Sequence, residues 1–155
     1  MALQSFSHLG ICVADLDRST RFYVDVLGFR ELFSVDFDGE LAATMERGGA
    51  FTSRMLRRDD VRIELLHWHD GTAAGDGRRR SMDARGVTHL CFRVDEATEL
   101  IEIAERCGGG AWPATLTSMD GAGEGGQALR TVYLTDPDGV RIECISGMPD
   151  IATMG

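Results

Sequence analysis

The sequence contains no lysine, and arginine supplies every basic side chain of its 155 residues. Acidic residues outnumber basic ones by 25 to 16, which gives a formal net charge of −9. A protein that binds nucleic acid needs a basic surface to meet the phosphates. This composition therefore argues against a nucleic-acid partner. The absence of lysine is also typical of a GC-rich genome.

Long apolar runs and paired cysteines are absent as well. No run approaches the roughly 20 apolar residues of a transmembrane helix, and no basic segment followed by an apolar one marks a secretory signal. The cysteines show no Cys-x-x-Cys spacing and are predicted to be free thiols: Cys12, Cys91, Cys107 and Cys144. With 43% hydrophobic and 26% charged residues, we expect a globular cytoplasmic protein that has no membrane partner.

A repeated tetrapeptide indicates an internal duplication. Val-Arg-Ile-Glu occurs twice, ending at Glu64 and at Glu143, and each copy follows a His-Leu pair. Glu64 lies 56 residues after His8 (64 − 8), and Glu143 lies 54 residues after His89 (143 − 89). Each half thus supplies one histidine and one glutamate. Together the four residues could close a two-His, two-Glu metal site.

The predicted secondary structure has the same β-α-β-β-β order in both halves. In the first half the patterns favour strands at 6–13, 30–36, 52–57 and 61–68 and a helix at 18–27. In the second half they favour strands at 89–94, 111–118, 128–135 and 140–145 and a helix at 96–107. Residues 41–47 fit either a short helix or a strand.

These elements define the expected domain organisation. One α+β domain would hold a first module at 5–69, a linker at 70–86, a second module at 87–147 and a frayed tail at 148–155. The linker carries the basic run 78–80, which would be a solvated loop or a docking point for an anionic substrate tail. A glycine-rich stretch at 118–127 would be a mobile hairpin loop or a lid.

Strand alternation predicts which side chains share a face with the two glutamates. Valine and isoleucine at 61, 63, 140 and 142 would face the helices, so that Glu64 and Glu143 lie on the opposite, polar face. A carboxylate in mid-strand is costly unless it meets a cation, a donor or water. A metal ion would satisfy both glutamates. The alternative is a pair of glutamates that bind arginines on an exposed face, beside histidines that merely pack.

Other residues on this face are candidates for substrate binding. Arg93 and Arg141 each carry a planar fork of donors that fits a carboxylate, although a structural salt bridge explains them equally well. Cys91 shares the face of His89 and would be a small apolar filler or a reactive thiol. His67 and His69 would be surface residues or a separate metal site. Phe22 and Tyr23, on the first helix, are expected in the core.

Several segments of the chain resemble the vicinal oxygen chelate superfamily, which groups glyoxalase I, methylmalonyl-CoA epimerase, extradiol dioxygenases, fosfomycin-resistance proteins and bleomycin-binding proteins. The resemblance covers about residues 5–147 and is carried by these segments: 7–19, 21–29, the strand around Glu64, 86–90 and 136–143. It implies two βαβββ modules that form an open, U-shaped mixed sheet around a metal-binding cleft. Members often dimerise, so a homodimer is expected, with the site inside one chain or between two.

The resemblance also implies a ligand set of His8, Glu64, His89 and Glu143 for one divalent ion. Nitrogen and oxygen ligands suit Ni, Co, Mn or Fe in an octahedral site, or Zn in an expanded one. Dioxygenases and fosfomycin-resistance proteins typically use two histidines and one glutamate, so Glu64 favours the isomerase branch. Epimerases often have glutamine there and a His-His pair where this chain has Thr88-His89. The glyoxalase type is therefore favoured.

The implied activity is that of a lyase or isomerase of the glyoxalase I type. Glu143 or Glu64 would move a proton next to a carbonyl, through a metal-bound enediolate. The substrate would be a small molecule, either a thiol adduct or a CoA thioester, and many GC-rich bacteria use thiols other than glutathione. The alternatives are an epimerase of methylmalonyl-CoA type, an extradiol dioxygenase, and a non-catalytic drug-binding protein of the bleomycin-resistance type.

Overall fold

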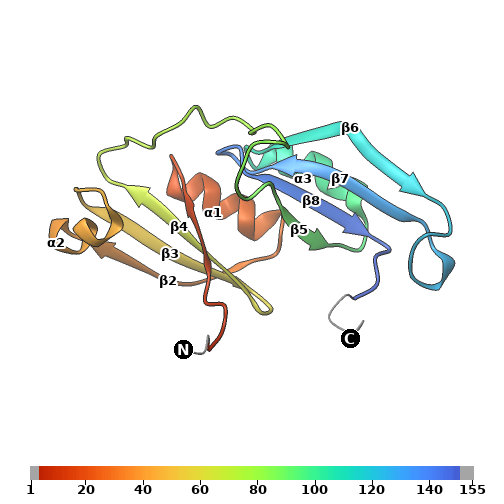
Figure 1. The fold of residues 1–155 in the computed structure, drawn as a ribbon, viewed down its shortest axis with the longest axis horizontal. Coiled ribbons are helices and arrows are strands. Elements are labelled where there is room, and N and C mark those ends of the chain that lie inside the picture. Colours follow the sequence, from red (N-terminus) through yellow and green to blue (C-terminus); the bar gives the residue numbers. More distant parts are fainter. Residues whose placement is uncertain (1–3, 151–155) are drawn as a thin grey trace. The chain divides into compact units, whose positions relative to one another are not determined.

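The computed structural model describes residues 4–150 and divides the chain into two compact units. The boundary falls between Asp76 and Gly77, inside the segment expected to link the modules. Each unit is a βαβββ module with one four-stranded mixed sheet (Figure 1). The predicted α+β class and the two modules are confirmed. Within residues 4–150, no helix is long and apolar enough to cross a membrane.

The sheet of the first unit has the strand order β1-β4-β3-β2. Its strands are β1 (Leu9–Cys12), β2 (Arg30–Phe37), β3 (Phe51–Arg58) and β4 (Val61–Trp68). Its helical segments are α1 (Leu16–Asp25), α2 (Gly39–Ala42) and the 3₁₀ turn η1 (Ala43–Met45). β1 runs parallel to β4, and the other neighbours are antiparallel. β4, the last strand of the module, is therefore an inner strand of the sheet and lies beside β1, the first strand.

The second unit repeats this topology, with the strand order β5-β8-β7-β6. Its strands are β5 (Leu90–Arg93), β6 (Gly110–Met119), β7 (Leu129–Thr135) and β8 (Arg141–Ser146). Its helical segments are the 3₁₀ turn η2 (Ala97–Glu99), α3 (Leu100–Arg106) and the 3₁₀ turn η3 (Glu124–Gly126). β5 pairs with β8 in parallel, as β1 does with β4.

Helix α1 spans Leu16–Asp25, two residues earlier at each end than the predicted 18–27, and begins after a capping aspartate. The side chain of Asp15 accepts a hydrogen bond from the Arg18 amide at 2.9 Å, which also lowers the pKa of this carboxyl. Gly28 follows the helix with φ +69°, a conformation that glycine adopts without strain. Phe22 and Tyr23 are fully buried, so their predicted place in the core is confirmed.

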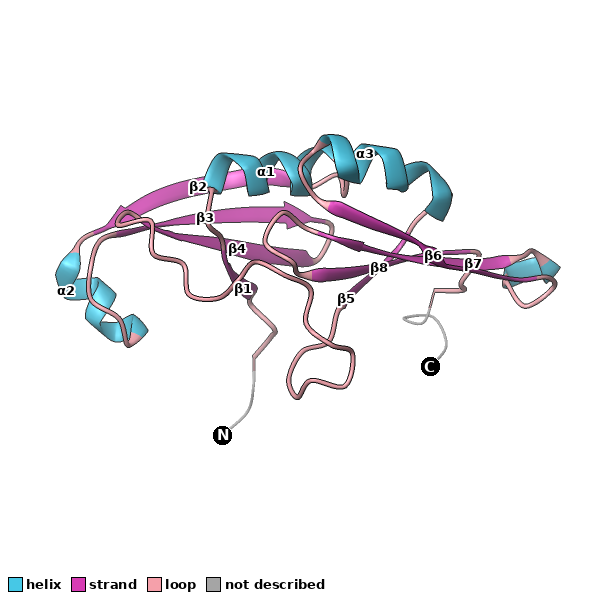
Figure 2. Ribbon diagram, turned by 90° about the horizontal axis from the view of Figure 1, so that it is seen from above, coloured by secondary structure: helices cyan, strands magenta, loops and turns pink. Residues whose placement is uncertain are grey.

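In each unit the helix covers one face of its own sheet (Figure 2). Ile63 and Leu65 in β4, and Ile142 and Cys144 in β8, are fully buried. Because side chains alternate along a strand, the two glutamates between them project from the other face. Val61 was expected to pack with these residues but is 42% exposed, since it begins β4 directly after the exposed turn at residues 59–60.

The helical segments differ from the prediction in two places. The segment at 41–47 is helical, because α2 and η1 occupy it up to Met45. The single helix expected at 96–107 is divided into η2 and α3. There the side chain of Glu96 accepts a hydrogen bond from the Thr98 amide at 3.2 Å, which starts a 3₁₀ turn before the α-helix forms. Of the tail predicted at 148–155, residues 151–155 lie outside the described part of the chain.

Candidate metal centre

Each unit holds one histidine–glutamate pair on the face of its sheet away from the helix. In the first unit His8 Nε2 lies 3.2 Å from Glu64 Oε2. In the second unit His89 Nε2 lies 3.1 Å from Glu143 Oε2. Parallel pairing of the first and last strands of each module produces both contacts, because Gly10 pairs with Glu64 and Cys91 with Glu143. Each histidine lies two residues earlier on the same face.

The second ring nitrogen of each histidine is hydrogen-bonded to the hydroxyl of the preceding residue. The distances are 3.0 Å from Ser7 Oγ to His8 Nδ1 and 2.9 Å from Thr88 Oγ1 to His89 Nδ1. If Nδ1 carries the proton and donates it to the hydroxyl, Nε2 presents its lone pair to a metal ion. These hydroxyls were not among the predicted site residues, although the sequence carries a signal for them, since a hydroxyl residue precedes the histidine in both copies.

The second oxygen of each glutamate accepts a hydrogen bond from a neighbouring strand. Ser53 Oγ donates to Glu64 Oε1 at 2.5 Å, and Thr131 Oγ1 donates to Glu143 Oε1 at 3.0 Å. The two donors are structurally equivalent, because each lies two residues before the register partner of its glutamate. Both ends of each His–Glu pair are thus oriented by hydroxyl groups, an arrangement that is common around metal ligands.

The surroundings of the two glutamates differ in two side chains. The Glu143 carboxylate also interacts with the side chains of Cys91 and Tyr133, whereas Gly10 and Met55 occupy the equivalent positions beside Glu64. Burial, and then the Glu143 charge, raise the pKa of Cys91 to about 11. The same two causes raise the pKa of the Tyr133 phenol. Both groups therefore remain protonated donors near neutral pH.

The geometry of each pair fits two ligands of one divalent ion. Ligands about 2.1 Å from an ion and at right angles to each other lie about 3 Å apart, close to the observed nitrogen–oxygen distances of 3.2 and 3.1 Å. The glutamates are 18% exposed and the histidines 37% and 29%, so an ion could reach all four. Within either unit, the described residues form no group of three or more potential ligands. Each unit thus contributes a pair.

The two predicted substrate-binding arginines make structural contacts. Arg141 is only 6% exposed and donates to the carbonyl groups of Arg80 at 2.6 Å and Thr88 at 3.3 Å. Arg93 donates from Nε to the Met148 carbonyl at 3.0 Å and also lies 3.3 Å from the carboxylate of Asp150. Arg93 thus makes an ion pair, the structural alternative to substrate binding, whereas Arg141 makes hydrogen bonds to backbone carbonyl groups; a role of either arginine in substrate binding stays a prediction. Arg141 joins the end of the linker to the strand that carries Glu143.

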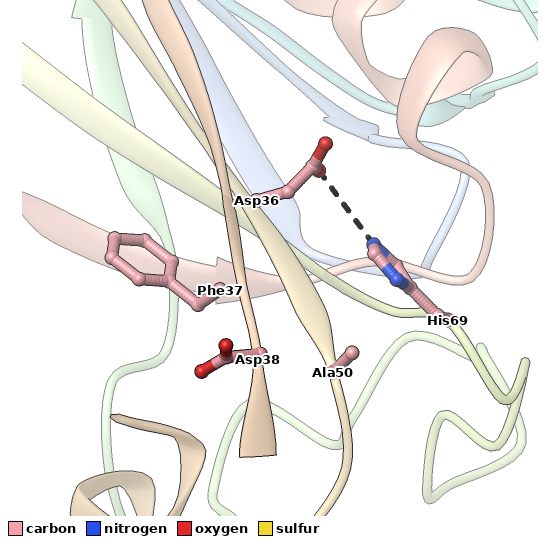
Figure 3. A pocket seen from close by; sticks show the side chains of 5 residues that line it. All are labelled: Asp36, Phe37, Asp38, Ala50 and His69. Atoms are coloured by element: carbon pink, nitrogen blue, oxygen red, sulfur yellow. Dashed lines mark ion pairs between the residues drawn. The ribbon is translucent and has the colours of Figure 1, made fainter. Parts of the chain in front are cut away.

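His67 and His69 lie apart from the His8–Glu64 pair. The Nδ1 atom of His67 lies 3.3 Å from the Val13 carbonyl oxygen. His69 lines an open pocket of about 520 Å³ with Phe37, Ala50 and two aspartates. Figure 3 shows one of these, Asp36, pointing toward His69, and the distance from Asp36 Oδ1 to His69 Nε2 is 3.7 Å. The side chain of Thr52 lies between the two, hydrogen-bonded to each.

Two βαβββ modules, each with one mixed sheet and a His–Glu pair on the face away from its helix, define the class of fold. The chain belongs to one family of that class: its residues 5–144 match the model of the Glyoxalase/Bleomycin resistance protein/Dioxygenase superfamily. It is 29% identical over 154 residues to a lactoylglutathione lyase of Haemophilus influenzae, which covers 96% of each chain.

Solved structures show the same fold. The chain matches a glyoxalase family protein from Bacillus cereus with a TM-score of 0.78 and 19% identity, over 96% of this chain and 97% of that one. It also matches a fosfomycin resistance protein from Listeria monocytogenes, solved with Mn(II) and sulfate, with a TM-score of 0.59 and 18% identity over 95% of each chain. At these identities the likeness concerns the fold alone.

Proposed function

We propose that the protein is a divalent-metal-dependent lyase or isomerase of the glyoxalase I type, which transfers a proton next to a substrate carbonyl. The observation that carries this proposal is the presence of the same His–Glu pair in both units, at 3.2 and 3.1 Å. The similarity to the Haemophilus influenzae lactoylglutathione lyase along nearly the whole chain supports the reaction type.

His8, Glu64, His89 and Glu143 would together hold one Ni, Co, Zn, Mn or Fe ion, within one chain or between the two chains of a homodimer. When bound, the ion would act as a Lewis acid on the substrate carbonyl. Two neutral imidazoles and two carboxylates match the preferences of these metals. The hydroxyl groups on the far side of each ligand would hold it in the binding orientation.

The glutamates would carry the proton. A carboxylate that releases one oxygen from its partner can accept a proton from the carbon next to the carbonyl and return it to the neighbouring carbon. Glu64 is the better candidate for this movement, because its side chain is held only by His8 and Ser53 among the described residues. Glu143 is held by His89, Thr131, Cys91 and Tyr133 and is suited to a fixed position.

Metal analysis of the purified protein tests the metal-binding half of the proposal. We expect one divalent ion per chain, and Glu64→Gln and Glu143→Gln should each weaken its binding by about tenfold or more, because each removes a charged ligand. His69→Gln is the matched control, since it removes a histidine outside the pairs. Two ions per chain with independent losses would contradict a shared centre. A protein that binds no divalent ion at micromolar concentration would be a binding protein rather than an enzyme.

Activity after metal loading tests the reaction. The substrates would be hemithioacetals of a 2-oxoaldehyde with several thiols, methylmalonyl-CoA and a catechol, with the ion supplied as Ni²⁺, Co²⁺, Zn²⁺, Mn²⁺ or Fe²⁺. We expect turnover of a hemithioacetal that falls in both glutamate variants and not in His69→Gln. Epimerisation of the CoA ester, or oxygen uptake with the catechol, would assign a different reaction to the same centre.

A further inference from the structure

In the second unit an arginine of the linker stacks on an aromatic ring. The guanidinium carbon of Arg79 lies 3.7 Å from the centre of the Trp112 ring. Among residues 4–150 it has no hydrogen-bond or ion-pair partner. The comparable stack in the first unit, Arg47 on Trp68 at 4.2 Å, differs, because Arg47 is bound to Asp70 at 2.9 Å. Arg79 is thus an oriented cation with no anion beside it among the described residues.

The stack lies on the same sheet face as Glu143. Trp112 in β6 pairs with Tyr133 in β7, which pairs with Glu143 in β8, and residues in register across a sheet project from one face. Two strand spacings of about 4.8 Å put Trp112 roughly 10 Å from Glu143. The ring of Tyr133 lies between them, and its centre is 5.9 Å from that of His89. An aromatic surface therefore leads from the His–Glu pair to Arg79.

We propose that Arg79 and Trp112 form a substrate subsite for a carboxylate. The substrate, in this proposal, is a small thiol conjugate whose carboxylate lies roughly 10 Å from the reacting carbon, the distance given by two strand spacings. A guanidinium stacked on a ring keeps the N–H groups of its edge free, and these match the two oxygens of a carboxylate. For the reacting end of the substrate, the inference rests on the proposed function. For the carboxylate end, it rests on the Arg79–Trp112 stack alone.

A single free guanidinium favours a carboxylate over the phosphates of a CoA ester. The neighbouring arginines of the run have other partners, since Arg80 donates to the Arg85 carbonyl and Arg78 also makes contacts. One unpaired cation can bind one carboxylate, whereas a polyphosphate carries several charges. The net charge of −9 also repels a strongly anionic ligand. The subsite therefore selects a thiol with a free carboxylate.

Tryptophan fluorescence and calorimetry test the subsite without relying on activity. The probes are S-methylglutathione as a carboxylate-bearing thiol, its dimethyl ester as the uncharged analogue, and coenzyme A as the phosphate-bearing thiol. We expect the thiol with free carboxylates to bind at least about tenfold more tightly than its ester, as charge-assisted hydrogen bonds do. Arg79→Gln should remove this difference. Arg79→Lys, which keeps the charge but lacks the fork, should retain part of it.

Arg47→Gln is the matched control, because it removes the cation from the other tryptophan and should leave probe binding unchanged within about twofold. Circular dichroism checks that the variants are folded. Equal binding of S-methylglutathione by the wild type and Arg79→Gln would overturn the subsite, as would coenzyme A binding that depends on Arg79 while carboxylate binding does not. Repeating the titrations with EDTA separates the two proposals, because binding that depends on Arg79 in a protein without metal supports the subsite by itself, whereas only the absence of metal binding or of turnover overturns the proposed function.

Discussion

Removal of the Ser53 hydroxyl should weaken metal binding more than removal of the equivalent Thr131 hydroxyl. Ser53 is 4% exposed and is the sole donor to Glu64 Oε1 among the described residues. In Ser53→Ala the Glu64 side chain would keep only its contact with His8. In Thr131→Val, Glu143 would still be held by Cys91 and Tyr133. The two substitutions thus remove equivalent hydrogen bonds from unequally restrained carboxylates.

The size of the effect follows from side-chain freedom. Without the serine hydroxyl the Glu64 side chain can adopt several rotamers. Fixing it again in one rotamer costs up to about 1.5–2 kcal/mol in conformational entropy. In Ser53→Ala this loss would occur on metal binding rather than on folding. The dissociation constant should therefore rise by about tenfold to thirtyfold, since 1.4 kcal/mol is a factor of ten. For Thr131→Val we expect less than about threefold. The free energy of unfolding without metal should fall by about 1 kcal/mol in each variant.

Competition titrations with a metal-sensitive dye measure these dissociation constants, and urea unfolding measures the stability. Ser146→Ala is a suitable control, because Ser146 is also 4% exposed and lies in β8 without a side-chain hydrogen bond among the described residues. Equal effects of Ser53→Ala and Thr131→Val would refute the reasoning. A larger effect of Thr131→Val would mean that Glu143, not Glu64, depends on its strand hydroxyl.

Three further predictions concern stability. The Thr72 amide, and then Arg47, lower the pKa of Asp70 to about 2. The Asp70 carboxylate therefore stabilises the folded protein fully above about pH 4, its pKa in the unfolded chain, and this contribution is lost as the pH falls through 2. In urea unfolding from pH 5 to 2, the free energy of unfolding should depend less on pH in Asp70→Asn than in the wild type. Gly147→Ala should lower the free energy of unfolding by about 3 kcal/mol or more, because Gly147 has φ +77° and a Cβ there would lie 2.3 Å from the Ala128 carbonyl oxygen. Gly121→Ala, at φ +72° with open space around it, should cost only about 1 kcal/mol, as measured by thermal unfolding. Arg141→Gln should cost about 2 kcal/mol by removing its bonds to the carbonyl groups of Arg80, in the linker, and Thr88, and trypsin should then cleave the linker faster.

The fold could be predicted from the sequence because duplication and alternation constrain the same strands twice. The strand predicted at 61–68 has those bounds as β4, since a turn precedes it and its apolar residues alternate. The parallel contact of His8 with Glu64 follows from the βαβββ topology, which puts the first and last strands of a module side by side. The pairing within each half was therefore accessible, although the union of both pairs in one centre stays a prediction.

The hydroxyl partners could not be predicted in the same way. Ser53 and Glu64 meet because β3 and β4 pair in a particular antiparallel register, and a shift of one residue would turn the serine to the other face. Strand alternation also failed to distinguish the roles of Arg141 and Arg93. It predicts the face from which a side chain projects, whereas the partner depends on which segment covers that face. For Arg141 that segment is the end of the linker.

The two halves share the His–Glu pair but differ in the residues beside it, and this difference argues against equal roles for the two glutamates. A small residue and a thioether, Gly10 and Met55, leave Glu64 with few restraints, while a thiol and a phenol fix Glu143. Tyr133 also begins the aromatic surface that leads to Trp112. If the two pairs join in one centre, the second unit would hold the substrate and the first would supply the movable base. Such a division requires a change at Tyr133 to affect substrate binding and a change at Met55 to affect the proton transfer.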